Sequence, residues 1–366
     1  MKIVFTGNPA ADYFYPIIAV AEELNTIIDD ENLADINMYY MSSKPFDKRM
    51  LYENGINFIK TLSGSSRFSI SSFMGALNGV IQTFSIFPDV IFSTGGVAAY
   101  PTLFAARLLR IPVIVHESNS TPDSINAWSK DFAYAVTTAY KQEIDFFEKG
   151  KLIHVGQPIR HSLKEPIATG AYEFLNLEEN TPILWIIGGT RGSKNINRII
   201  EEALPELLNH YQVVHQTGED DFEDMKLLTD ATLINHKFKY RYHPFSFLNQ
   251  LSMKMMAGVS DMVISRAGSS LFEIAYWEIP SIIIPITKSR HNHQIKNAYN
   301  YAREGGCIVI EENNLSDQGL IFEIKRIIGN EKVRAGMKAG ARSFALRDAG
   351  EKIAKEIIEI VLVHEK

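Results

Sequence analysis

The stretch of residues 260–297 constrains the fold of this chain more than any other. Two short apolar runs rich in β-branched residues, at residues 262–265 and 280–284, flank a segment that we interpret as a helix. Continuous apolar runs of this length are typical of parallel strands that are buried on both faces. A strand, a helix and a second strand in this order predict a βαβ unit, and hence an open parallel sheet.

The turn between the first of these strands and its helix has the composition of an anion site. Gly268 makes the turn, Ser269 and Ser270 can cap the helix, and Glu273 falls in its first or second turn. Backbone N–H groups at a helix N-terminus suit a phosphate, and a carboxylate one turn on can accept hydrogen bonds from a ribose. Arg266 adds positive charge. The alternative is that Gly268 merely ends a strand, Ser269 is an ordinary N-cap and Glu273 is solvated.

The polar loop after the second strand favours the ligand site over this alternative. The loop enters another helix, so we expect His293, Gln294 and Asn297 to emerge at the carboxyl edge of the neighbouring strand. Ligands of open α/β sheets bind at that edge.

Composition excludes several classes of protein. With 366 residues, of which 46% are hydrophobic and 22% charged, the chain is long enough for two globular domains. The net charge of -6 argues against a general nucleic-acid binder. The single cysteine, Cys307, excludes a disulfide framework and a Cys-rich metal site, and fits a reducing cytoplasm. No segment reaches the roughly 20 apolar residues that a transmembrane helix needs, so we expect a protein that is soluble or rests on a membrane.

The rest of the chain predicts two similar α/β halves. We expect a loop at residues 7–13 and a helix at residues 16–28, and a second βα series begins at Thr181 with a glycine-rich turn. Each half is therefore expected to be a Rossmann-like, doubly wound parallel sheet, with a cleft between the halves. The predicted domains are residues 1–158 and 159–348, with a helix at 349–366 packing back on the first. The predicted strands lie at residues 2–6, 36–41, 57–60, 90–93, 113–116, 135–138 and 153–155, and at 182–187, 212–215, around 240, 262–265, 281–285 and 307–310.

An uncharged, apolar segment at residues 68–88 has helical spacing. A helix that is apolar over so wide an arc is either buried or laid in a membrane interface, and we favour burial. Lys60 and Arg67 flank it, as would suit anionic headgroups.

Eight motifs in their order and spacing resemble the MurG glycosyltransferases over nearly the whole chain. They are Y-P-I-I-A-V-A-E-E-L, P-D-V-I-F-S-T-G-G, I-P-V-I-V-H-E-S-N, V-G-Q-P-I-R, I-I-G-G-T-R-G-S-K-N-I-N, H-Q-T-G, S-R-A-G-S-S-L-F-E-I and H-Q-I-K-N-A. The resemblance implies a GT-B fold and an inverting transfer of GlcNAc from UDP-GlcNAc to a lipid-linked muramyl-pentapeptide diphosphate in peptidoglycan synthesis. It further implies no cofactor and no metal, no nucleic-acid partner, and a peripheral location on the cytoplasmic face of the cell membrane.

The resemblance places the donor site mainly in the second half. Glycines of the turn near residue 190 would let backbone N–H groups approach the diphosphate, and Glu273 matches a ribose-binding acid. His293 and Gln294 match a glutamine pair of which only the second is retained, and Arg191 stands where glutamine is usual. The implied donor residues are Arg160, Gly188, Gly189, Thr190, Arg191, Gly192, Arg266, Gly268, Ser269, Ser270, Leu271, Glu273, His293, Gln294 and Asn297.

The acceptor side is implied to lie in the first half. For His116 the alternative is a histidine satisfied by its neighbours, and that alternative stays open. Asp123 stands where glycine is usual, and it adds negative charge close to where the lipid diphosphate would lie. The implied acceptor residues are Ala10, Ala11, Gly95, Gly96, His116, Glu117, Asn119 and Asn126.

The first loop departs from the family. MurG proteins have G-G-T-G-G-H there, whereas this chain has G-N-P-A-A-D-Y at residues 7–13, with Tyr13 in place of the histidine. A tyrosine with a pKa of about 10 is a poor base at neutral pH, so we expect Asp12 to serve, with Tyr13 beside it as the second catalytic candidate. Two other functions remain open: a nucleotide-sugar binding protein with impaired catalysis, and a hexosamine 2-epimerase.

Overall fold

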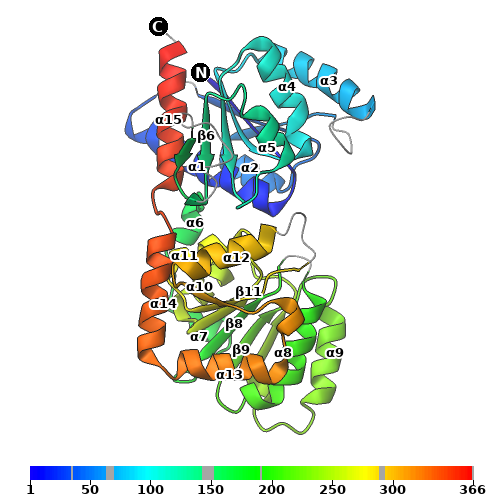
Figure 1. The fold of residues 1–366 in the computed structure, drawn as a ribbon, viewed down its shortest axis with the longest axis vertical. Helices are drawn as coiled ribbons and strands as arrows, with labels where there is room; N and C mark the ends of the chain where they lie inside the picture. The colour runs from blue at the N-terminus through cyan, green and yellow to red at the C-terminus, as the bar shows by residue number, and fades with distance from the viewer. Residues whose placement is uncertain (34–35, 63–69, 142–151, 190–191, 288–292, 365–366) are drawn as a thin grey trace. The chain divides into compact units, whose positions relative to one another are not determined.

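The computed structural model describes residues 1–33, 36–62, 70–141, 152–189, 192–287 and 293–364. The chain divides into two compact units, of which unit 1 comprises Met1–His161 with Leu346–Lys366, and unit 2 comprises Ser162–Ala345 (Figure 1).

Unit 1 contains a seven-stranded sheet in the order β3-β2-β1-β4-β5-β6-β7, in which every neighbouring pair is parallel. The order reverses between β1 and β4, so the helices that follow these two strands leave towards opposite faces. The predicted strands of the first half are confirmed, with ends that differ by one or two residues. They are β1 (Lys2–Gly7), β2 (Asn37–Ser42), β3 (Ile56–Lys60), β4 (Val90–Gly95), β5 (Val113–Glu117), β6 (Ala135–Thr138) and β7 (Leu152–His154).

Two helices from opposite ends of the chain cover one face of this sheet. Side chains of the first and last helices, including Ile17, Leu24 and Ile357, form one buried cluster with Phe5 of β1. The helices of unit 1 are α1 (Ala11–Asp30), α2 (Lys48–Glu53), α3 (Ile70–Ile86), η1 (Val97–Ala99), α4 (Tyr100–Leu109), α5 (Ser124–Ser129) and α15 (Ala349–His364), and α6 (His161–Lys164) follows at the boundary.

The first helix begins earlier than the sequence predicts. It starts at Ala11 rather than at residue 16, so the loop after β1 is short and Asp12 and Tyr13 lie in the first turn of α1. Alanine is the strongest helix former, so Ala11 favours this start. The helix continues through Pro16, which removes one intrahelical hydrogen bond from its interior. The expected seven-residue loop is therefore wrong.

The outer face of α3 is exposed, so the preference for burial was wrong for the described part of the segment. Gly75 and Gly79 let the helix approach its neighbours closely, because an added Cβ would lie 2.2 Å from the Leu62 carbonyl oxygen and 2.5 Å from that of Pro101. Figure 1 shows α3 beside α4. Arg67 and Phe68 lie outside the described residues. The apolar side chains on the outer face are Met74, Leu77, Ile81 and Phe84, and Phe87 follows directly after the helix. Each of the five is 60–64% exposed.

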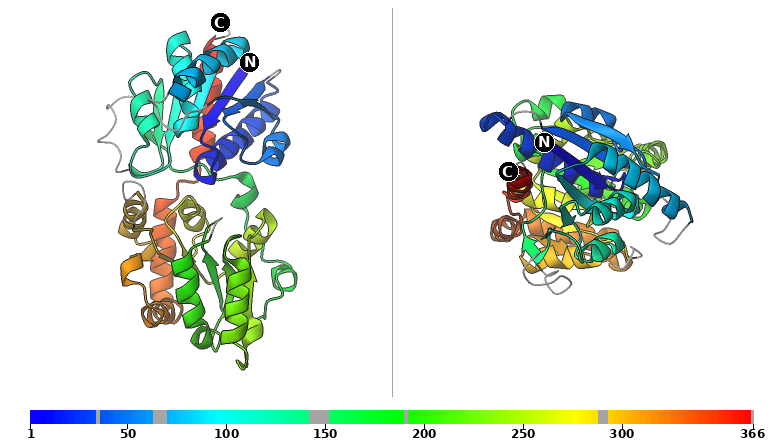
Figure 2. Two further views of the ribbon diagram at one scale, coloured as in Figure 1. Left: turned by 90° about the vertical axis from the view of Figure 1, so that its right-hand side faces the viewer. Right: turned by 90° about the horizontal axis from the view of Figure 1, so that it is seen from above.

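Unit 2 contains a six-stranded parallel sheet in the order β10-β9-β8-β11-β12-β13, which reverses between β8 and β11. Figure 2 shows helices on both faces of the sheet. The strands, all near the predicted positions, are β8 (Ile183–Ile187), β9 (Gln212–Gln216), β10 (Tyr242–Phe245), β11 (Met262–Ser265), β12 (Ser281–Ile283) and β13 (Cys307–Val309). The helices are α7 (Ala171–Phe174), α8 (Lys194–Leu207), α9 (Phe222–Thr232), η3 (Lys239–Arg241), α10 (Gln250–Val259), α11 (Ser270–Tyr276), α12 (His293–Arg303), η5 (Glu312–Asn314), α13 (Asp317–Ile328) and α14 (Glu331–Phe344).

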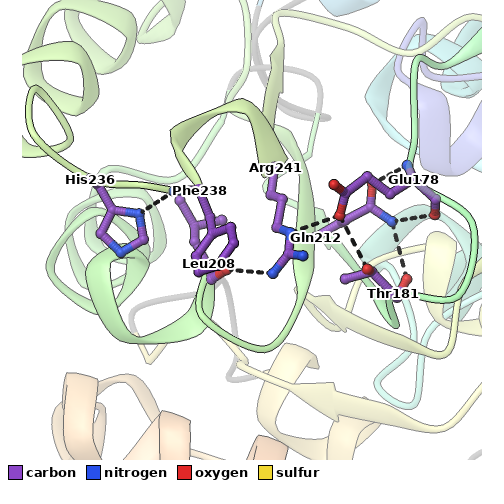
Figure 3. A network of polar contacts seen from close by, with 7 residues as sticks. All are labelled: Glu178, Thr181, Leu208, Gln212, His236, Phe238 and Arg241. Carbon is purple, nitrogen blue, oxygen red and sulfur yellow. Dashed lines mark hydrogen bonds and ion pairs between the residues drawn. The ribbon is translucent and has the colours of Figure 1, made fainter.

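A polar network fixes the amino edge of the unit 2 sheet (Figure 3). Arg241 donates through Nε to Glu178 Oε2 at 2.8 Å and through Nη1 to the Leu208 carbonyl oxygen at 3.1 Å. The side chain of Gln212, at the start of β9, donates to the carbonyl oxygens of Glu178 and Thr181. These contacts join the segments that enter β8, β9 and β10. They lie on the amino edge of the sheet, opposite to the carboxyl edge where ligands of such sheets bind.

Candidate functional site

The glycine-rich turn after β8 has two positions that only glycine fits. Gly192 has φ +81°, and an added Cβ would lie 2.0 Å from the Thr217 carbonyl oxygen. Gly189 has φ +90°, a region that other residues rarely adopt, yet nothing described lies within 4 Å of where its Cβ would be. The backbone at Gly189 is therefore open to close approach by a ligand. Thr190 and Arg191 lie outside the described residues.

Neighbouring backbone and side chains hold this turn in place. Gly188 donates its N–H to the Gln216 carbonyl oxygen at 3.2 Å, and Gln216 Nε2 donates to the Gly189 carbonyl oxygen at 3.3 Å. Ser193 caps α8 by accepting the Ile196 N–H. The positive end of a 14-residue helix thus begins directly after the open turn, which is the arrangement that binds phosphates.

The turn after β11 lies beside it, because β11 pairs with β8. Ser269 occupies the N-cap position of α11 but makes no capping hydrogen bond through its side chain, and Ser270 Oγ lies 3.2 Å from Ser265 Oγ. Glu273 is 8% exposed in the first turn, and Leu271 is fully buried. The alternative of an ordinary serine cap with a solvated Glu273 is therefore wrong.

Arg266, expected to offer its charge to a ligand, is held by the protein itself. Its Nη1 donates to the Ile284 carbonyl oxygen at 3.1 Å, and its Nη2 donates to Ser193 Oγ and to Glu312 Oε1 at 2.5 and 2.6 Å. Burial alone would raise the pKa of Glu312, but hydrogen bonds from Arg266 and Asn195 outweigh it and the pKa is lowered. Among the described residues, the Arg266 Nε has no hydrogen-bond partner.

The start of α12 supports the same edge. Gln294 Oε1 accepts the N–H of Ile286, which follows β12, at 3.0 Å. Asn297 is 2% exposed and donates to the Ala267 carbonyl oxygen at 3.2 Å, beside Gly268. His293 is the first residue of the helix and is half-buried. Gln294 and Asn297 thus hold the loops that follow β12 and β11.

The described donor candidates therefore share the carboxyl edge of the unit 2 sheet, except for Arg160. Arg160 belongs to unit 1, where it is 5% exposed and its guanidinium carbon lies 3.8 Å from the centre of the Tyr15 ring.

In unit 1 the turns after β1 and β4 meet at the point where the strand order reverses. Gly95 and Gly96 have φ of +89° and +80°, and added Cβ atoms would collide with the side chains of Asn126 and Asn8. The Asn8 Oδ1 accepts the Ala98 N–H at 3.1 Å, and Asp123 Oδ1 accepts the Gly96 N–H at 3.1 Å. The N–H groups of Gly96 and Ala98 thus already donate to side-chain oxygens of the protein.

Glu117 organises the loop that follows β5. Its carboxylate accepts the N–H groups of Asn119 at 3.0 Å and Asp123 at 2.8 Å, and Nδ2 of Asn126 at 2.8 Å. Burial raises the pKa of Glu117 to about 7, and this desolvation outweighs the three hydrogen bonds, which lower it. Glu117 thus fixes the positions of Asn119 and Asn126.

His116 has a partner on each ring nitrogen. Nδ1 lies 3.0 Å from Thr137 Oγ1, and Nε2 lies 3.1 Å from Gln157 Oε1. Burial lowers the pKa of His116 to about 4, so the ring is neutral at physiological pH. This geometry favours the alternative of a histidine satisfied by its neighbours.

The two catalytic candidates lie at the start of α1, after Ala10 at the N-cap and Ala11 at the first helical position. Asp12 is exposed and Tyr13 is half-buried. Thr94 Oγ1 donates to the Tyr13 carbonyl oxygen at 2.8 Å, which ties the turn to β4.

Three residues at these edges were not anticipated as part of a site: Asn8, Ser193 and Glu312. Glu312 is 46 residues from Arg266 in sequence and carries no motif, so no sequence pattern could have found it. Within the described ranges, no cluster of three or more His, Cys, Asp or Glu side chains could hold a metal ion.

Glu117 gives a test of the acceptor-side loop. We expect Glu117→Gln to destabilise the protein, because an amide N–H would face a donor where a carboxylate oxygen now accepts. The folded protein holds the Glu117 proton more tightly than the unfolded chain, because the folded-state pKa is raised. Protonated Glu117 therefore contributes its full stabilisation below the ordinary pKa, and this contribution is lost as pH rises through about 7. The deficit of the variant relative to the parent should therefore shrink, by on the order of 2 kcal/mol, between pH 5 and 8. Denaturant unfolding at several pH values measures it, and a deficit that stays constant or grows with pH would contradict the assignment.

Models of one family match both parts of the chain. The glycosyltransferase family 28 N-terminal domain matches residues 13–138, and the glycosyltransferase family 28 C-terminal domain matches residues 183–353. A UDP-N-acetylglucosamine–N-acetylmuramyl-(pentapeptide) pyrophosphoryl-undecaprenol N-acetylglucosamine transferase 2 of Bacillus cereus is 30% identical over 369 residues, covering 98% of this chain and 99% of that protein. A transferase from Clostridium botulinum, with the same name but without the number, is 31% identical over 91% of this chain and 92% of that protein.

Solved structures share the fold at lower identity. The crystal structure of Acinetobacter baumannii MurG superposes with a TM-score of 0.74 at 19% identity, over 98% of this chain and all of that chain. A UDP-GlcNAc 2-epimerase from Neisseria meningitidis bound to UDP-GlcNAc superposes with a TM-score of 0.70 at 13% identity, over 98% of this chain and all of that chain. These likenesses confirm the GT-B architecture of two Rossmann-like parallel-sheet domains, which transferases and epimerases share. By its matches along both domains and its full-length relatives, the chain belongs to glycosyltransferase family 28 and, within it, to the MurG family of N-acetylglucosamine transferases.

Proposed function

We propose that this protein transfers GlcNAc from UDP-GlcNAc to the muramyl-pentapeptide of a lipid-linked diphosphate, with inversion at the anomeric carbon. The observation that carries the proposal is the carboxyl edge of the unit 2 sheet, where the open backbone at Gly189 follows β8 and the buried Glu273 follows the neighbouring strand β11. Relatives that match over the full length of the chain bear the name of this transferase. An epimerase has no such support, because its likeness extends only to the fold.

On the donor side, the N–H of Gly189 and those of the first turn of α8, at its positive end, would bind the diphosphate. Glu273 would accept the ribose hydroxyls. His293 and Gln294 would face the sugar, with Gln294 retaining its bond to the loop after β12. During transfer the bond between the anomeric carbon and the phosphate oxygen breaks, and the electron pair leaves with UDP. The fixed donors of the turn stabilise the charge that develops on the diphosphate.

On the acceptor side, we assign Asp12 as the base that removes the proton of the acceptor hydroxyl as its oxygen attacks the anomeric carbon. Asp12 is exposed, as a base that meets a second substrate must be. Tyr13 is a weaker candidate because a phenol is protonated at neutral pH. Asn119, held by Glu117, would contact the acceptor. Asn126, expected to do the same, is fully buried and donates to Glu117, so it supports the loop instead.

A second candidate, nucleotide-sugar binding without efficient transfer, is favoured by one observation. The carboxylate of Asp123 accepts the Gly96 N–H, where the family is expected to bind the acceptor diphosphate. Release of UDP from UDP-GlcNAc, measured with and without the lipid-linked acceptor, separates the two functions. Acceptor-dependent release supports the transferase, and binding of UDP-GlcNAc without release supports the second candidate.

The donor assignment predicts that Glu273→Ala weakens UDP and UDP-GlcNAc equally, because the ribose is common to both. The loss of charge-assisted hydrogen bonds corresponds to roughly 1.5–3 kcal/mol, or about a ten- to hundredfold higher Kd. Titration calorimetry on the folded variant measures it. An unchanged UDP affinity would remove Glu273 from the donor site.

The assignment of the base predicts that Asp12→Asn lowers turnover by about a hundred- to ten-thousandfold and leaves the affinity for UDP-GlcNAc intact. Tyr13→Phe, the matched change at the next residue, should have a much smaller effect. A turnover of Asp12→Asn close to that of the parent would exclude Asp12 as the base.

We further propose that the outer face of α3 binds the cytoplasmic face of the cell membrane. Four apolar side chains of α3 and Phe87 directly after it are exposed, and the adjacent α4 exposes Leu108 (62%) as well. No described helix is long and apolar enough to cross a membrane. An amphipathic helix of this kind binds at the interface through its apolar face.

The membrane proposal predicts that Leu77→Ser with Phe84→Ser reduces binding to anionic phospholipid vesicles by roughly tenfold or more, since two large apolar groups no longer enter the bilayer. The melting temperature should change little, because both side chains are already exposed. Leu227→Ser with Phe322→Ser, which alters two comparably exposed residues of unit 2, is the control and should bind like the parent. Vesicle sedimentation measures both, and equal binding by all three proteins would refute the proposal.

A further inference from the structure

The buried ion pair Arg266–Glu312 joins four loops at the carboxyl edge of the unit 2 sheet. Arg266 directly follows β11, and its side chain reaches the carbonyl oxygen of Ile284 after β12 and the hydroxyl of Ser193 at the N-cap of α8. Glu312 follows β13. Arg266 and Glu312 have side chains only 10% and 13% exposed. We call Ser193, Arg266 and Glu312 the bracket.

Glu312 adds further contacts to the same loops. Its Oε1 accepts from Asn195 Nδ2, in the first turn of α8, at 2.8 Å, and its Oε2 accepts from Thr287 Oγ1, after β12, at 3.4 Å. The bracket therefore ties the first turn of α8 to the loops that follow β11, β12 and β13. The open glycine turn is attached to α8 through Ser193, so its position depends on these contacts.

We propose that Glu312 is a positioning residue for the donor: it holds Arg266 and Ser193 so that Gly189 and the first turn of α8 present their N–H groups to the diphosphate. This inference rests on the proposed function, because it takes UDP-GlcNAc as the ligand of that turn. It assigns a role to a residue that no motif marked, and it replaces the expectation that Arg266 meets the ligand as a free charge.

The competing possibility is that Arg266 leaves Glu312 and binds the diphosphate directly, for which its unpartnered Nε would be available. That movement would break the bonds to Ile284, Ser193 and Glu312, and would leave the Glu312 carboxylate without its cation in a largely buried position. Breaking a buried pair in this way is strongly unfavourable, so the geometry favours positioning.

The two possibilities predict opposite changes in affinity when Glu312 is removed. If Glu312 positions the turn, Glu312→Ala raises the Kd for UDP by about tenfold. If Glu312 only competes with phosphate for Arg266, the same variant binds UDP more tightly. Glu312→Gln keeps an oxygen that accepts from Arg266, so under positioning it should recover most of the affinity that Glu312→Ala loses.

The amino-edge pair of the same sheet supplies a matched control. Glu178 also binds an arginine, Arg241, at 2.8 Å, with 14% of the Arg241 and 34% of the Glu178 side chain exposed (Figure 3). Glu178→Ala should lower the melting temperature and leave the Kd for UDP within about twofold of the parent. Glu178→Ala therefore shows whether lower stability alone can weaken UDP binding, which the effect expected at Glu312 requires it not to do.

The experiment combines calorimetry with UDP, steady-state kinetics with UDP-GlcNAc and amide hydrogen exchange of α8. We expect Glu312→Ala to raise Kd and KM about tenfold with a much smaller change in kcat, and to speed exchange in the first turn of α8, which Glu178→Ala should not do. If Glu312→Ala does not fold, Ser193→Ala removes the bracket's hydroxyl alone and should shift Kd in the same direction by a few-fold.

Tighter UDP binding by Glu312→Ala, or unchanged binding together with unchanged exchange, overturns the inference. A parent that binds no UDP overturns the proposed function instead. In that case faster exchange in Glu312→Ala would still support the holding of α8, and unchanged exchange would refute it.

Discussion

Parallel strand pairing is the constraint on which the rest of this structure depends. It directs the carboxyl ends of all strands in each sheet to one edge, and the strand order reverses once, between β1 and β4 in unit 1 and between β8 and β11 in unit 2. At a reversal the two following helices leave towards opposite faces, so their first turns separate and expose backbone N–H groups. Most candidate residues lie in turns that follow these four strands. Asn126 and Asn297, which follow the neighbouring strands β5 and β12, donate to carbonyl oxygens of Thr94 and Ala267 and so support those turns.

The strands were predictable because a strand buried on both faces must be a continuous apolar run, and few other elements produce one. The start of α1 was not, because nothing local distinguishes a short turn at Ala10 from a longer loop. The exposure of α3 was not predictable either, since a wide apolar arc is compatible with a core and with a membrane surface. What decides it is the close approach of Gly75 and Gly79 to the carbonyl oxygens of Leu62 and Pro101. That contact selects which face turns inward.

Side-chain pairings were the least predictable part of the candidate site. Glu273 was a candidate because its place after a strand, a turn and a helix start suits a ribose-binding carboxylate. The partner of Arg266 was not, because Ser193 and Glu312 lie 73 and 46 residues away and are brought to it by sheet order alone. An arginine at a strand end looks like a ligand group in sequence whether or not a carboxylate already neutralises it. The same holds for His116, whose two ring partners come from β6 and from Gln157.

The two edges differ in what they leave for a negatively charged ligand. In unit 2 the backbone at Gly189 is open, and the nearby carboxylate of Glu312 is paired with a cation. In unit 1 the N–H groups of Gly96 and Ala98 are bonded to Asp123 and Asn8, so a diphosphate would have to displace oxygens that the chain supplies. Contacts at that edge should therefore contribute less to acceptor affinity than donor contacts do. If α3 rests on the bilayer as proposed, a lipid-linked acceptor in the same bilayer would offset this weakness, because confinement to a surface raises its effective concentration without any new contact.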